Sequence, residues 1–239
     1  LALLATWFAS RPASKANTYG YFRSEILAAL LNGMVLLLLS GFILVEAFSR
    51  VFSAPEVLSG PMLIVAIGGL ILNLVAMRLL APASGHSLNI KAAYLEVLAD
   101  MLGSVAVIAA SLIIMFTGWT VIDPIVSALI GLMIVPRTWL LIKECVHILM
   151  EGTPSRIELD ELRAAIIAVD GVVDLHDLHV WTITSSKDAM SAHAVINKSA
   201  DVDVVLASIL EITRERFQLH HSTVQVERVE CTVSEPACL

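Results

Sequence analysis

The sequence predicts an α-helical membrane domain over residues 1–150, followed by a small α/β domain over residues 151–239. Two observations lead to this prediction. Of the 239 residues, 57% are hydrophobic and only 15% are charged, a composition too apolar for an ordinary soluble domain. The long uncharged runs all lie in the first 150 residues, whereas short helical patterns alternate with β-branched runs in the remainder.

Four predominantly apolar segments are expected to cross a bilayer, which takes roughly 20 apolar residues. The apolar segment from Leu1 to Ala9 is too short to span and lacks the basic start of a signal peptide. We expect it to be the end of a membrane helix whose beginning is missing. The four predicted spans are residues 26–45, residues 57–77, the helix bearing Glu96 and Asp100 as far as Phe116, and the run from Val121 to Val135 or beyond.

The distribution of basic residues predicts the topology. Arg11, Lys15 and Arg23 share the first connection, and Arg137 and Lys143 follow the last span. Because basic residues favour the cytoplasmic side, the polar tail is expected in the cytoplasm. The three cysteines form no disulfide framework, which fits a reducing compartment. The net charge of −7 argues against nucleic acid as a partner.

Two carboxylates stand at the start of the third span. Glu96 and Asp100 are spaced i, i+4, so a helix places both on one face, about one turn apart. Such a pair repels unless a cation or a shared proton lies between the two groups, and divalent cations favour oxygen ligands. The pattern therefore indicates half of an intramembrane metal site. The alternative, which is open above all for Glu96 near Lys91, is a pair of solvated charges at the helix mouth.

The tail reads as α-β-β-α-β. Helical spacing runs from Leu159 to Val169, with Gly171 after it, and again from Val204 to Phe217. The predicted strands are Val172–Thr184, Ala189–Ile196 and Thr223–Val229, and the first two are joined by a turn at residues 185–188.

Five histidines border these strands: His176, His179, His193, His220 and His221. Neutral imidazoles together with a carboxylate such as Glu227 make a zinc-type ligand set. For any one of these histidines, a surface or packing role is the alternative. Cys231 and Cys238, with six residues between them, are either ordinary thiols or additional soft ligands.

Taken together, these stretches resemble the cation diffusion facilitator transporters, in particular their zinc-exporting branch. The resemblance runs in order along essentially the whole chain. The matching segments are Thr18-Tyr-Gly-Tyr-Phe-Arg-Ser-Glu-Ile-Leu-Ala-Ala-Leu-Leu-Asn-Gly33, Glu96 to Ser104, Asp123-Pro124, Leu149-Met-Glu-Gly-Thr-Pro154, His176-Asp-Leu-His-Val-Trp181, Ser191-Ala-His193 and His221-Ser-Thr-Val-Gln-Val-Glu227.

The resemblance implies a homodimer with six helices per subunit, about four and a half of them in this chain. It implies a ferredoxin-like, metallochaperone-like tail in the cytoplasm and a location in the cell's inner membrane. The implied activity is export of Zn²⁺, and also of Cd²⁺ or Co²⁺, in exchange for protons by alternating access. Zn²⁺ would be both cargo and regulator, and we expect no enzymatic activity and no organic cofactor.

The resemblance also implies roles for individual residues. The second ligand pair of the transport site corresponds to Glu96 and Asp100, with Glu where zinc members usually have His. The first pair would precede Leu1. His179 is expected to be structural, and the loop at 79–91 holds only His86, so no ligand cluster is expected there. The implied tail site is His176, His193, His220 and Glu227, with His221 as a replacement for His220 and with Cys231 and Cys238 as further contributors.

Two other functions fit parts of the pattern. A membrane-anchored metal sensor would bind metal in its tail without transport, although it would not need intramembrane carboxylates. An intramembrane aspartyl protease would need two aspartates that share a proton. The only other deep acid is Asp123, which stands beside Pro124 at a helix start and is better explained by capping.

Overall fold

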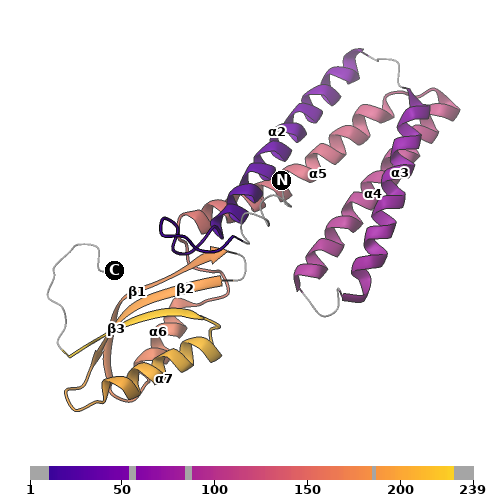
Figure 1. Cartoon of the computed structure of the whole chain (residues 1–239). Helices are drawn as coiled ribbons and strands as arrows, with labels where there is room; N and C mark the ends of the chain where they lie inside the picture. The colour runs from indigo at the N-terminus through magenta and orange to yellow at the C-terminus, as the bar shows by residue number, and fades with distance from the viewer. Residues whose placement is uncertain (1–10, 54–57, 84–87, 185–186, 229–239) are drawn as a thin grey trace. The chain divides into compact units, whose positions relative to one another are not determined.

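The computed structural model describes residues 11–53, 58–83, 88–184 and 187–228 (Figure 1). The chain forms two compact units, one over Met34–Trp139 and one from the described residues before and after that range. This division falls inside two long helices. The boundary expected at residue 150 remains a prediction.

Four long helices make up most of the first 150 residues. They are α2 (Arg23–Ser53), α3 (Ser59–Leu80), α4 (Leu88–Thr117) and α5 (Ile122–Leu149), with a short 3₁₀ turn, η1 (Ala81–Ala83), after α3. All four are long and apolar enough to cross a membrane, which confirms the four expected spans. Helix α2 begins earlier than predicted, at Arg23, and α3 ends later, at Leu80. Helix α4 begins at Leu88, inside the loop expected at 79–91. Helix α5 continues beyond Val135, as expected, through Arg137 to Leu149.

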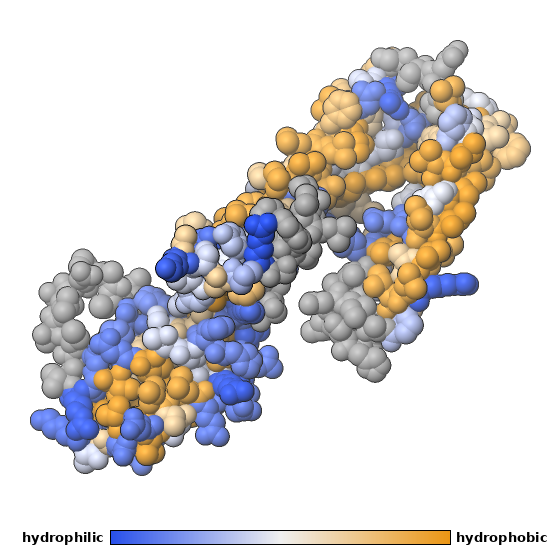
Figure 2. Space-filling view, viewed as in Figure 1, coloured by the Kyte–Doolittle hydropathy of each residue, from blue (hydrophilic) through white to orange (hydrophobic). Residues whose placement is uncertain are grey.

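The helices carry apolar side chains on nearly every face. In α3 the only buried residue is Ala66, while Ile64, Val65 and Leu79 are mostly exposed. Figure 2 shows a predominantly hydrophobic surface over these helices. A helix that is apolar all round suits a lipid environment, since no polar face is left for water.

Small residues let the helices approach closely. A Cβ at Gly131 of α5 would lie 3.0 Å from the Leu44 side chain of α2, and one at Gly69 of α3 would lie 3.4 Å from the Ser104 hydroxyl of α4. Close contact at small residues is the usual means of helix association in membranes.

The tail folds as the expected α-β-β-α-β unit. Its sheet has the order β1-β2-β3, with β1 antiparallel to β2 and β2 parallel to β3. The second and third strands both begin two residues earlier than predicted, and the third ends two residues earlier. The elements are α6 (Leu159–Ile167), β1 (Val172–Thr184), β2 (Lys187–Ile196), α7 (Val202–Glu215) and β3 (His221–Glu227).

Both tail helices cover the same face of the sheet (Figure 1). The fully buried side chains on this face come from both helices and from two strands: Leu162 and Ile166 of α6, Ile209 of α7, Leu175 of β1 and Ala194 of β2. Side chains alternate between the two faces of a strand, so the neighbours of the buried strand residues point to the uncovered face. The candidate metal ligands lie on that second face.

The start of α2 contacts this same unit. The Thr184 hydroxyl at the end of β1 donates a 2.6 Å hydrogen bond to Glu25, and Arg23 forms a 2.8 Å ion pair with Glu151. The Lys187 ammonium lies 3.8 Å from the centre of the Phe22 ring. A segment near the beginning of the described chain is thus held by residues far along the sequence.

Candidate metal centres

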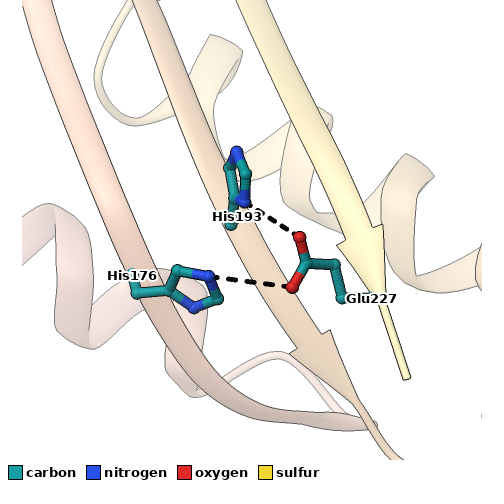
Figure 3. Close-up of side chains that lie close together, drawn as sticks. All are labelled: His176, His193 and Glu227. Atoms are coloured by element: carbon teal, nitrogen blue, oxygen red, sulfur yellow. Dashed lines mark ion pairs between the residues drawn. The ribbon is translucent and has the colours of Figure 1, made fainter. Parts of the chain in front are cut away.

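Three candidate ligands, one from each strand of the tail sheet, come together. His176 of β1 lies opposite His193 of β2 in the antiparallel register, and Glu227 of β3 pairs with Val195, two residues beyond His193. Each follows or precedes a core residue by one position, so all three project from the face opposite α6 and α7. Figure 3 shows the two rings and the carboxylate facing one another.

The carboxylate of Glu227 lies between the two rings. Its Oε1 is 2.9 Å from His193 Nδ1, and its Oε2 is 3.7 Å from His176 Nε2. The ring centres are 5.2 Å apart. The Glu227 side chain is only 8% exposed and accepts a 2.7 Å hydrogen bond from the Gln225 amide. A buried carboxylate in this position brings negative charge to two imidazoles.

The donor set fits a metal ion. One ligand atom from each residue can be chosen so that all three lie within 4.8 Å of one another, and this is the only such group of three among the described residues. Two ligands of a tetrahedral zinc ion, each about 2.0–2.2 Å from it, lie roughly 3.3–3.6 Å apart. The distances of 2.9 and 3.7 Å fall on either side of that range.

Two ring nitrogens in this cluster have no hydrogen-bond partner. His176 Nδ1 and His193 Nδ1 are buried, and within the described part of the chain neither makes a hydrogen bond of acceptable geometry. The short distance from His193 Nδ1 to Glu227 is an ion-pair contact without a suitable angle. Burying a polar atom without a partner costs about 1–3 kcal/mol, and coordination to a cation would remove that cost.

Asp177 is a fourth polar residue at this site, and the sequence analysis did not identify it. The pairing of β1 with β2 shifts between His176 and His179, and Asp177 lies in this irregular stretch with a positive φ of 53°. Its carboxylate lies 3.7 Å from His193 Nε2 and 2.8 Å from His179 Nε2. His193 therefore has an acid on each side of its ring. An Asp between two histidines of one strand was the available signal.

The other tail residues are not brought to the cluster within one chain. His220 precedes β3 and His221 begins it, and both are exposed. Six residues of extended strand separate His221 from Glu227, a distance of roughly 20 Å. His179 is exposed and pairs with Asp177. Cys231, Cys238 and His86 lie outside the described residues.

The acid pair of the third span lies on α4 as expected. Glu96 and Asp100 are one turn apart, and both are exposed in the single chain. Glu96 Oε2 forms a 3.2 Å ion pair with an Arg137 Nη2 nitrogen of α5. Arg137 was expected only to mark the cytoplasmic side, because sequence spacing does not indicate which residues of two different helices meet.

Asp123 takes part in a separate ion pair. It lies in the first turn of α5, where capping was expected, and its side chain is 8% exposed. An Arg50 Nη1 nitrogen lies 3.2 Å from Asp123 Oδ2, and Arg50 Nε lies 3.0 Å from Glu46. Arg50 thus joins the end of α2 to the start of α5. A carboxylate paired with a guanidinium does not need to share a proton with a second aspartate.

Two family models match this chain, and together they cover both the helices with the acid pair and the tail with the histidine cluster. Residues 1–150 match the family described as the cation efflux transmembrane domain, and residues 154–229 match the cation efflux protein cytoplasmic domain. The chain belongs to the cation efflux family. This confirms the resemblance found in the sequence. The cation efflux protein is an integral protein of the inner membrane with its C-terminal domain in the cytoplasm.

Several relatives align with nearly the whole chain. The metal cation efflux system protein CzcD of Cupriavidus metallidurans is 42% identical, over 99% of this chain and 75% of CzcD. The zinc transporter ZitB of Pectobacterium atrosepticum is 40% identical, over 97% of this chain and 72% of ZitB.

A third relative is the cadmium, cobalt and zinc/H(+)-K(+) antiporter of Bacillus subtilis, which is 38% identical over 95% of this chain and 74% of its own length. One similar solved structure is the metal-bound C-terminal domain of the CzcD transporter from Cupriavidus metallidurans, which is 32% identical. It covers 30% of this chain and 99% of its own, with a TM-score of 0.29.

Proposed function

We propose that this cation efflux protein exports divalent metal ions, Zn²⁺ foremost, in exchange for protons, by alternating access. The observation that carries the proposal is the carboxylate pair on α4. Between Glu96 and Thr117 this span holds no charged residue other than Glu96 and Asp100. Placing a charged carboxylate inside a bilayer costs free energy, and acidic residues found there usually line a pathway for ions or protons.

The proposed cargo follows from ligand chemistry and from the relatives. Carboxylates bind Zn²⁺, Cd²⁺, Co²⁺ and harder divalent ions. One relative is named a zinc transporter and another a cadmium, cobalt and zinc antiporter. Metal ligands must be deprotonated, so protons compete with the metal for the same oxygens. Exchange of metal for protons at Glu96 and Asp100 follows from that competition.

The tail is proposed to bind Zn²⁺ as a regulator and to hold two subunits together. His176, His193 and Glu227 would supply three of the ligands. The two buried Nδ1 atoms, which make no hydrogen bond within the described part of the chain, support this assignment. His220, His221, Cys231 and Cys238 remain candidates for a further ligand, for instance from a second subunit. We place the membrane domain at residues 1–150 and the cytoplasmic dimerisation domain at residues 151–239.

Regulation requires a difference in affinity between conformations. A metal in the tail shifts the transport cycle only if it binds one arrangement of the dimer more tightly than the other. The ligands of the tail cluster come from three strands of one subunit, so the cluster itself can form in either arrangement. The proposed regulatory step therefore depends on ligands added by the second subunit.

The decisive experiment is metal uptake into proteoliposomes with a pH-sensitive dye inside. We expect Zn²⁺ uptake together with proton efflux from the lumen, and loss of both in Asp100→Asn. A sensor without transport would bind Zn²⁺ in its tail but give no uptake in the same vesicles. A protease would cleave a membrane peptide, which we do not expect of a member of a transporter family.

A further inference from the structure

The long side chain of Arg137, in α5, reaches Glu96 of the candidate transport site on α4. Its guanidinium lies 3.2 Å from Glu96 Oε2, and the two side chains are 49% and 61% exposed in the single chain. Glu96 stands at the start of an apolar span, and Arg137 follows an unbroken apolar run in α5. No other ion pair between α4 and α5 is found among the described residues.

The pair changes the charge that an entering metal ion meets. Two carboxylates one turn apart carry two negative charges and repel each other, and a nearby cation relieves that repulsion. With Arg137 beside Glu96, the three groups together carry one negative charge. That is the charge of a neutral imidazole beside a single carboxylate. Arg137 also lies against Oε2, one of the two Glu96 oxygens that could bind the metal.

The backbone next to Arg137 leaves room for movement. Pro136 lies inside α5 and has no N–H group, so the carbonyl of Leu132 loses its usual helical partner. The helix can bend at this point without breaking another hydrogen bond. A change of bend at Pro136 would move the adjacent guanidinium relative to Glu96.

We propose that Arg137 is a positioning residue of transport: an internal counter-cation that holds Glu96 until the metal displaces it, and that returns to Glu96 as the metal leaves. This inference rests on the proposed function, because it assigns Glu96 and Asp100 to the metal. Competition between the guanidinium and the metal weakens metal binding. The same competition speeds release, because the vacated carboxylate regains a partner.

If Arg137 competes with the metal, removing its charge should lower both KM and kcat for Zn²⁺ transport. Exposed ion pairs are weak, so we expect Arg137→Gln to lower KM for Zn²⁺ by about three- to tenfold. Slower release should lower kcat by a similar factor, which leaves kcat/KM nearly unchanged. Arg137→Lys keeps the charge and should stay close to the wild type. Lys143→Gln removes an exposed cation six residues later in the same helix and serves as the matched control.

Equilibrium binding gives a second readout. In a His193→Ala background, which disables the tail cluster, Cd²⁺ binding to the detergent-solubilised protein reports the membrane site. Arg137→Gln should tighten that binding by the same three- to tenfold. In Glu96→Gln the carboxylate is gone, so adding Arg137→Gln should then change Cd²⁺ binding by less than twofold.

The outcomes separate the two proposals. If the wild type transports Zn²⁺ but Arg137→Gln leaves KM unchanged, or raises it, the counter-cation role is wrong and the proposed function stands. If kcat falls alone, Arg137 is only structural. If the wild type does not transport metal and the His193→Ala protein, with Arg137 intact, does not bind Cd²⁺, the proposed function itself fails.

Discussion

His193 Nδ1 lies 2.9 Å from Glu227 Oε1, although the two residues are 34 positions apart in the sequence. The parallel pairing of β2 with β3 creates this contact, since Val195 pairs with Glu227 and both His193 and Glu227 project from the face that α6 and α7 leave uncovered. The same register leaves His221 opposite Ala189. Strand register therefore decides which of the tail histidines meet the carboxylate.

The first prediction concerns thermal stability of the tail. Residues 151–239, which have a core of their own, should form a soluble dimer that Zn²⁺ stabilises by roughly 2.7 kcal/mol at a hundredfold excess over Kd. His193→Ala should abolish the rise in Tm, whereas His179→Ala, on the exposed side of Asp177, should keep most of it. Calorimetry with and without zinc measures both. A zinc-dependent Tm that survives His193→Ala would remove His193 from the site.

A second prediction concerns Asp177. Its carboxylate faces His193 Nε2, on the side of the ring opposite Glu227. A carboxylate behind a ligating imidazole orients the ring and raises its basicity, and loss of such a partner typically costs 10–100-fold in metal affinity. Asp177→Asn should weaken Zn²⁺ binding to the tail by about tenfold. Titration against a competing chelator measures it, and unaltered affinity would show that Asp177 serves only His179.

Asp100 carries the third prediction. Asp100→Ala should reduce Zn²⁺ transport at least tenfold, about 1.4 kcal/mol, while the protein still inserts into the membrane. Ser104→Ala is the matched control, because Ser104 lies one further turn along α4 and, among the described residues, its hydroxyl bonds only the Asp100 carbonyl. Vesicle uptake normalised to inserted protein distinguishes the two. Transport by Asp100→Ala at the wild-type rate would contradict the site assignment.

The fourth prediction concerns metal preference. Imidazole is a softer ligand than carboxylate, so Glu96→His should raise the ratio of Zn²⁺ to Mn²⁺ transport. Glu96→Gln keeps an oxygen ligand without the charge, and it should weaken transport of both ions without changing their ratio much. Competition of each ion for uptake of the other measures the ratio. The same selectivity in all three proteins would mean that Glu96 does not touch the metal.

Much of the fold was predictable because its signals are local. Long apolar runs gave the four spans, and β-branched residues gave both ends of the strand Val172–Thr184. The last span was expected to continue beyond Val135, and α5 does so, with Arg137 inside a continuous helix. Amphipathic spacing also gave both tail helices within a few residues of their ends.

The candidate sites were predictable only in part. The i, i+4 spacing on α4 needs one helix alone, so it could be read directly from the sequence. The ion pair of Glu96 with Arg137 depends on how two helices meet, and the approach of Asp177 to His193 depends on an irregular pairing of two strands. Spacing along one element shows neither contact, although the position of Asp177 between two histidines of β1 was a signal for that residue. The choice of His176 and His193 over His220 and His221 likewise required strand register.

The order of the sheet gives the tail cluster a mechanical consequence. β1 and β3 are the outer strands, and each is hydrogen-bonded only to β2. His176 and Glu227 belong to these two outer strands, so an ion held by both would be a direct cross-brace between them. Sliding β1 past β3 would then require breaking coordination bonds as well as two backbone ladders. A pulling experiment on the tail should show a higher unfolding force with zinc than without it.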